Sequence, residues 1–100
     1  METMSDVIQN LSLIGAPILG ISACRDWHRD LDEALNSHAD AIVLDMSSVE
    51  KIDTACLQLL TAFVLQARAN DIALSWHEPS EHFLSAVNSL NLNAALGVEP

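Results

Sequence analysis

Acidic and hydroxyl side chains that could carry chemistry are concentrated in residues 45–57, at Asp45, Ser47, Ser48, Asp53 and Thr54. An apolar run precedes this segment and helical spacing follows it, so it joins a strand to a helix start, where α/β sheets usually keep their ligand crevice. The first N–H groups of a helix lack partners within the helix and carry partial positive charge. A hydroxyl such as that of Thr54 is therefore suited to phosphorylation, because the amides and the dipole would hold the added negative charge. The simpler interpretation is that Asp53 or Thr54 caps the helix, which stabilises it by about 1 kcal/mol.

Asp45 and Asp53 could instead indicate a magnesium site or the phospho-acceptor of a receiver domain. A receiver needs adjacent acids at the end of its first strand and a lysine at the end of a late strand. The predicted first strand, residues 7–14, carries no acid, and Lys51 is the only lysine. The pattern favours a local role for Asp45, whose carboxylate can accept N–H bonds from the loop that follows it.

The run from His77 to His82 could suggest a metal site. The second histidine follows the first by five residues rather than four, and Pro79 prevents one continuous helix from presenting both rings on one face. The run is more typical of a solvated corner between a strand and a helix. The sequence also contains no nucleophile elbow or glycine-rich phosphate loop, and Cys56 is interpreted as a small core thiol. We therefore predict no catalytic site, metal or cofactor; the alternative from another class is a small enzyme or ligand carrier that uses the crevice near Asp45.

The composition predicts one folded, acidic domain over residues 1–100. Half of the 100 residues are apolar, and 14 acidic against 4 basic residues give a net charge of −10. Such a field repels phosphate backbones and anionic lipid headgroups, which argues against nucleic acid and direct membrane contact and favours a basic protein surface as partner. No signal-peptide pattern or apolar run of membrane length is present, and Cys24 and Cys56 form no CxxC pair, which predicts reduced thiols in a cytoplasmic protein.

Hydropathy spacing predicts alternating strands and helices. The predicted strands are residues 7–14, 18–21, 41–44 and 72–76, and the predicted helices begin at Ser22, at Thr54 (running to Asn70) and near Pro79. The turn at residues 15–17 would join the first two strands as a hairpin, Ser22 would cap the first helix, and Asn70 would end the second in a left-handed conformation. A last turn or short strand is expected at residues 94–98. The order is β-β-α-β-α-β-α, which predicts an α/β fold with a four- to five-stranded mixed sheet and helices packed mainly on one face.

The run Ile42-Val-Leu-Asp-Met-Ser-Ser-Val49, followed by Ile52-Asp-Thr-Ala-Cys-Leu-Gln-Leu-Leu60, resembles the signature of the STAS family, which includes the anti-anti-sigma factors. The similarity extends over most of the chain and implies the same fold. In that family the hydroxyl residue after this aspartate is the phosphorylation site, which falls on Thr54. The resemblance implies a bacterial, non-catalytic antagonist that docks an anti-sigma factor of the serine-kinase type, and phosphorylation would add about two negative charges and weaken docking. The implied contact residues are Asp45, Ser47, Ser48, Asp53, Thr54, Ala55, Cys56 and Ser22.

Two positions differ from the usual STAS pattern and bear on the partner rather than on the fold. The family often has glycine where this chain has Cys56, and it commonly has aspartate where this chain has Ser22. Relatives with the same Asp-Thr-Ala sequence include small subunits bound to the ATPase of phospholipid-trafficking transporters, and others accompany chemotaxis and signalling proteins. The alternative prediction is a constitutive subunit of such a complex, with Thr54 as an unmodified contact.

Overall fold

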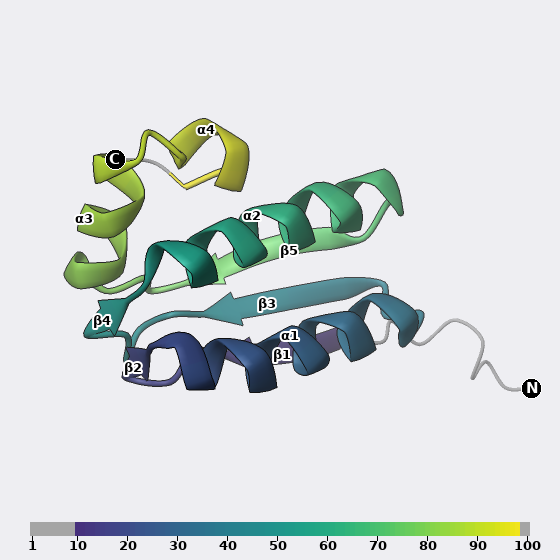
Figure 1. Cartoon of the computed structure of the whole chain (residues 1–100). Coiled ribbons are helices and arrows are strands. Elements are labelled where there is room, and N and C mark those ends of the chain that lie inside the picture. Colours follow the sequence, from purple (N-terminus) through teal and green to yellow (C-terminus); the bar gives the residue numbers. More distant parts are fainter. Residues whose placement is uncertain (1–9, 99–100) are drawn as a thin grey trace, which may run out of the picture.

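The computed structural model describes residues 10–98, in which strands and helices alternate along the chain (Figure 1). The strands are β1 (Asn10–Ile14), β2 (Ile18–Leu19), β3 (Ala41–Asp45), β4 (Lys51–Ile52) and β5 (Ala73–His77). The helices are α1 (Ile21–Asn36), α2 (Thr54–Ala69), α3 (Glu81–Ser89) and α4 (Asn93–Leu96). The predicted α/β class and the order of the main elements are confirmed.

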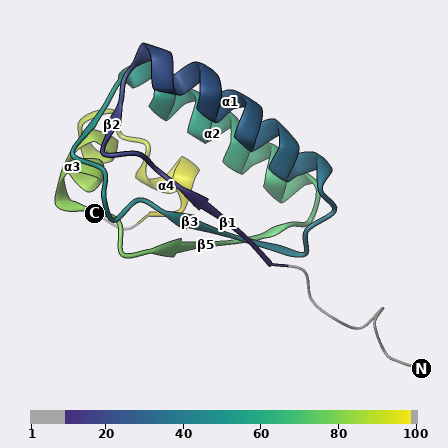
Figure 2. The same ribbon diagram turned by 90° about the horizontal axis from the view of Figure 1, so that it is seen from below.

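Two small sheets organise the chain. β1, β3 and β5 form a three-stranded sheet with β3 in the centre, and β2 pairs with β4 in a second sheet. Every described strand pair is parallel, rather than mixed as predicted. α1 and α2 lie next to each other over one face of the larger sheet, which Figure 2 shows from below. Among residues 10–98 no helix covers the opposite face, which confirms that the helices pack mainly on one side.

The core lies between this sheet face and the two long helices. Along β3, Ile42 and Leu44 are fully buried beneath the helices, whereas their neighbours are half-buried, because successive side chains of a strand point to opposite faces. The helices present apolar residues at three- and four-residue steps, which places these residues on one stripe. The buried residues of this stripe are Trp27, Leu31 and Ala34 on α1, and Cys56, Leu57, Leu60, Phe63, Val64 and Ala67 on α2.

The predicted hairpin between the first two strands is wrong, because β2 pairs with β4 and not with β1. The carbonyl of Pro17 accepts hydrogen bonds from the backbone N–H groups of Glu50 and Lys51, at 2.7 and 3.1 Å, and thereby ties the turn to the segment before α2. Gly15 is buried there, and a Cβ atom at this position would lie 2.8 Å from Sδ of Met46. Close packing therefore requires this glycine. Residues 7–9 of the predicted first strand lie outside the described residues.

Three predicted boundaries also change. Gly20 precedes α1, so Ser22 lies inside the first turn and is not the N-cap. Asn70 ends α2 with φ −94°, and the left-handed residue is the next one, Asp71, with φ 60°. The segment predicted as a last turn or short strand, residues 94–98, overlaps the single-turn helix α4, which is followed by Gly97 with φ 73°.

Candidate functional site

β2 and β4 place the starts of the two long helices side by side. β2 leads into α1 and β4 leads into α2, and their register pairs Ile18 with Lys51 and Leu19 with Ile52. The backbone N–H of Asp53 donates to the carbonyl of Leu19 at 3.0 Å and continues this alignment. Because the two strands run parallel and in step, both helices begin at the same end of the molecule, on the left of Figure 1.

Thr54 is the first residue of α2, and its side chain is exposed. Asp53 occupies the N-cap position, but its carboxylate makes no capping hydrogen bond, and the first turn contains no acidic residue. The simpler interpretation, in which one of these two side chains caps the helix, is therefore wrong. The partial positive charge of the helix start is left next to the Thr54 hydroxyl, where it would stabilise an added phosphate.

Asp45 ends β3 and orders the loop that follows it. Its carboxylate accepts hydrogen bonds from the Ser47 hydroxyl at 2.6 Å and from the Ser47 backbone N–H at 3.0 Å, which confirms the predicted local role. The bond from the Ser47 hydroxyl contributes most to lowering the pKa of Asp45 below its ordinary value, and the bond from the Ser47 backbone N–H lowers it further. The charge of His77 acts in the same direction. The side chains of Ser47 and Ser48 are exposed on this loop.

Ser80 links the loop after β3 to the start of α3 by hydrogen bonds. Its hydroxyl donates to the carbonyl of Val49 at 2.6 Å and accepts from the backbone N–H of Phe83 at 3.1 Å. Ser80 therefore caps α3 and fixes the loop at the same time, while Met46 and Val49 anchor the loop in the core. This role was not predicted, although a serine directly before Glu81 is a helix-start signal.

Cys56 lies beneath this surface rather than on it. Its side chain is fully buried, and its thiol donates to the carbonyl of Gly20 at 3.7 Å. Cys56 is therefore the core thiol that the sequence predicts, but its placement among the contact residues is wrong, because a partner cannot reach its side chain. Cys24, the other free cysteine, is half-buried on α1.

We expect alkylation to distinguish the two cysteines. Burial above all, together with the neighbouring Cys24 thiol, raises the pKa of Cys56 to about 12, so its reactive thiolate is scarce at neutral pH. Iodoacetamide should modify Cys24 at least about tenfold faster than Cys56 in the folded protein, as followed by peptide mass spectrometry. Denaturation in guanidinium chloride should bring the two rates together, and equal rates in the folded protein would contradict the buried position of Cys56.

An exposed apolar surface, which was not predicted, lies at this end of the molecule. Ile14, Ile18 and Ile21 are 66%, 61% and 67% exposed. They belong to the segment that leaves β1, forms β2 and begins α1, so the pairing of β2 with β4 brings the last two close to the start of α2. Hydropathy places such residues in a buried strand, so no sequence signal separates them from the core.

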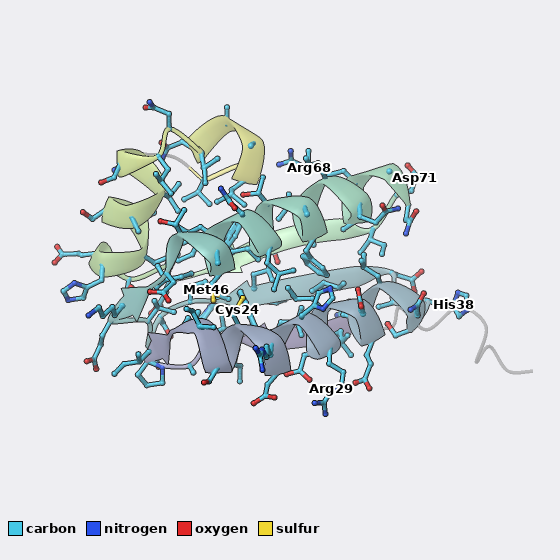
Figure 3. The ribbon with its side chains drawn as sticks, in the orientation of Figure 1. Cys24, Arg29, His38, Met46, Arg68 and Asp71 are labelled. Atoms are coloured by element: carbon cyan, nitrogen blue, oxygen red, sulfur yellow. The ribbon has the colours of Figure 1, made fainter. Side chains whose placement is uncertain are left out.

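The structure places the predicted contact residues in two groups. Ser22, Thr54 and Ala55 are exposed on the adjoining helix starts, whereas Asp45 ends β3 and Ser47 and Ser48 lie on the loop that follows it. Figure 3 shows Cys24 and Met46 in the half of the molecule that holds these groups, whereas His38 and Asp71 lie at the far end. We use the name docking surface for the exposed residues of both groups together with Ile18 and Ile21.

The described part of the chain offers no metal centre and no membrane span. Within residues 10–98, no group of three or more histidine, cysteine, aspartate or glutamate side chains could hold a metal ion. No helix of that range is both long enough and apolar enough to cross a membrane.

Comparison with known proteins identifies one family. Residues 4–98 match the family model described as "Mlab, STAS domain", so the match covers nearly the whole chain. No curated protein matches the chain.

Proposed function

This chain belongs to the STAS domain family, and we propose that it is a non-catalytic regulatory module that binds a partner protein through the docking surface. The observation that carries this proposal is the exposed hydroxyl of Thr54 on a helix start without a side-chain cap, at the same end of the molecule as the exposed Ile18 and Ile21. Exposed apolar residues next to polar ones are typical of protein–protein contacts. The net charge of −10 disfavours nucleic acid and anionic lipid and favours a basic partner surface. We place this activity in the cytoplasm.

In the leading form of the proposal, phosphorylation of Thr54 switches docking off, as in an anti-sigma factor antagonist. The positive end of α2 would stabilise the phosphate on the free protein, whereas a partner seated over Thr54 would have to strip water from about two negative charges. Asp53, half-buried beside Thr54, would orient the loop or the attacking kinase. The partner in this form is a protein of the serine-kinase type.

The alternative is a constitutive subunit of a transporter ATPase or of a signalling complex, with Thr54 as an unmodified contact. The exposed isoleucines favour this form, because permanent interfaces are more hydrophobic than transient ones. Mass spectrometry of the protein isolated from its cells distinguishes the two forms. Phosphate on Thr54 supports the switch, and its absence under all growth conditions supports the constitutive subunit.

Replacing Ile18 with aspartate should prevent partner binding in both forms of the proposal, the switch and the constitutive subunit. Ile18→Asp adds a charge to the apolar part of the docking surface, while its exposed position leaves the free energy of unfolding within about 0.5 kcal/mol. Co-purification from native cells, quantified by mass spectrometry, should fall at least about tenfold. Leu65→Asp is the matched control, since Leu65 is 54% exposed on α2 outside this surface. Equal recovery of one partner by both variants would contradict the proposed surface.

A further inference from the structure

A second surface feature, which we call the helix groove, runs along the junction of α1 and α2. Its first part, of about 500 Å³, has a mostly apolar lining that includes Ile21, Cys24 and Ala55. Its second part, of about 230 Å³, lies further along the helices. The apolar residues of the second part include Leu35, Ala62 and Phe63. Both parts are lined by His28 and Leu59, so they adjoin each other along the helix junction.

The geometry of the helix groove favours a helix as its occupant. α1 and α2 each contain 16 residues and begin at the same end of the molecule, so the groove follows two parallel helices (Figure 1). Helix backbones are hydrogen-bonded internally and offer no free edge for an added strand. An amphipathic helix, by contrast, can lay a stripe of apolar side chains into such a channel.

The net charge of −10 favours a basic occupant, although the lining of the helix groove itself carries one carboxylate, on Asp32, and one guanidinium, on Arg25. The carboxylate of Asp32 lies at the rim of the second part, 3.6 Å from Nε2 of His28, and both side chains are 60% exposed. α2 contributes only the uncharged Gln58 and Gln66 to the rim. Arg25 stands at the first part, while Arg29 points from α1 away from α2 in Figure 3. Positive side chains of an occupant therefore fit over the second part.

The net charge of the chain argues against a second copy as the occupant. Each copy carries a net charge of −10, so two copies joined along this face would repel each other. We propose that the helix groove binds a basic amphipathic helix of a partner protein, which lays its apolar side chains between α1 and α2 and its lysine or arginine residues beside Asp32. This surface extends beyond the docking surface along the length of the helices.

Three synthetic 16-residue peptides test this proposal by fluorescence anisotropy. The first is an amphipathic helix with a leucine stripe and lysines, the second has glutamate in place of lysine, and the third is a scramble of the first. The first peptide should bind at least about tenfold more tightly than the others, because only it combines the stripe with positive charge. Amide shifts on binding should map to α1 and α2 along the groove.

Two variants and two matched controls locate the binding. Asp32→Lys and Ala62→Arg, at the rim and on the floor, should each weaken binding of the first peptide at least about fivefold. Asp30→Lys makes the same charge change on the opposite flank of α1, which faces β1, and Ala69→Arg places the same side chain at the end of α2. Both controls should change the affinity less than about twofold.

Several outcomes would overturn the proposal. Tight binding of the scramble, equal losses in a variant and its control, or shifts outside the groove would show nonspecific attraction. Concentration-dependent dimerisation in sedimentation experiments, abolished by Ala62→Arg, would identify a second copy as the occupant. Thr54, Ser47 and Ser48 do not line the helix groove, so failure of the groove proposal leaves the proposed function of the docking surface standing.

Discussion

Replacing Thr54 with glutamate should prevent partner docking while the protein stays folded. The added carboxylate would stand at an exposed position of the docking surface, where a partner could not cover it without removing its water. We expect the affinity to fall at least about tenfold, which corresponds to about 1.4 kcal/mol. Pull-down from native cells with quantitative mass spectrometry measures this change. The thermal midpoint should remain equal or rise, because an acidic residue at a helix start stabilises the helix by about 0.3–1 kcal/mol.

Three further variants separate the effect of the added charge on docking from that of the lost hydroxyl. Ala69→Glu adds the same charge at the far end of α2 and should leave docking intact. Thr54→Ser should behave as wild type, and Thr54→Val, which keeps the shape without the hydroxyl, separates a hydrogen-bonded contact from a charge effect. If Thr54→Glu binds the partner as well as wild type does, the switch proposal is wrong. If Thr54→Val loses the partner to the same extent, Thr54 acts as a contact, as the constitutive subunit requires.

The elements that the sequence predicts well are those whose pattern is local. The apolar residues of α2 recur every three or four positions, and the predicted helix of residues 54–70 differs from the observed Thr54–Ala69 by one residue. The apolar run of residues 41–44 predicts a strand, and the structure places it in the centre of the sheet with one face beneath α1 and α2. In both cases a few neighbouring residues contain the information.

The pairing of β2 with β4 could not be predicted in this way. Each strand has only two residues, and the partners Ile18 and Lys51 are joined by contacts between distant segments. The turn signal at residues 15–17 is typical of a hairpin, but the carbonyl of Pro17 bonds to Glu50 and Lys51 instead. Tertiary contacts therefore decide this part of the fold, and the exposure of Ile18 follows from them.

In the candidate site, too, local pattern predicts some features and tertiary contacts decide the others. The order of Asp45, the loop and Thr54 along the chain indicates which hydroxyl stands at a helix start, and the structure places Thr54 there with its side chain exposed. Which of the next two residues faces the core depends on how α2 lies against α1. Ala55 is exposed and Cys56 is buried, so the motif residue that sequence analysis counted as a contact is part of the core.

Phe83→Ala should cause the largest loss of stability among single changes near the site. The ring of Phe83 is fully buried, and its centroid lies 5.5 Å from that of Trp76. Removing it should lower the free energy of unfolding by about 3–5 kcal/mol in urea titrations, because the cavity adds to the lost apolar burial. Phe83→Leu keeps most of the volume and should cost less than about 1.5 kcal/mol. A loss below about 1 kcal/mol for Phe83→Ala would contradict the packing of α3.

Phe83→Ala should also loosen the loop of the docking surface. Phe83 holds α3 in place, and the N–H of Phe83 donates to the Ser80 hydroxyl that in turn donates to the Val49 carbonyl in the loop after β3. Amide hydrogen exchange at residues 46–50 should therefore be faster in Phe83→Ala than in Phe83→Leu under conditions where both are folded. If exchange in this loop is the same in the two variants, α3 does not support the loop. The core beneath α3 and the loop on the surface would then act as independent parts of the molecule.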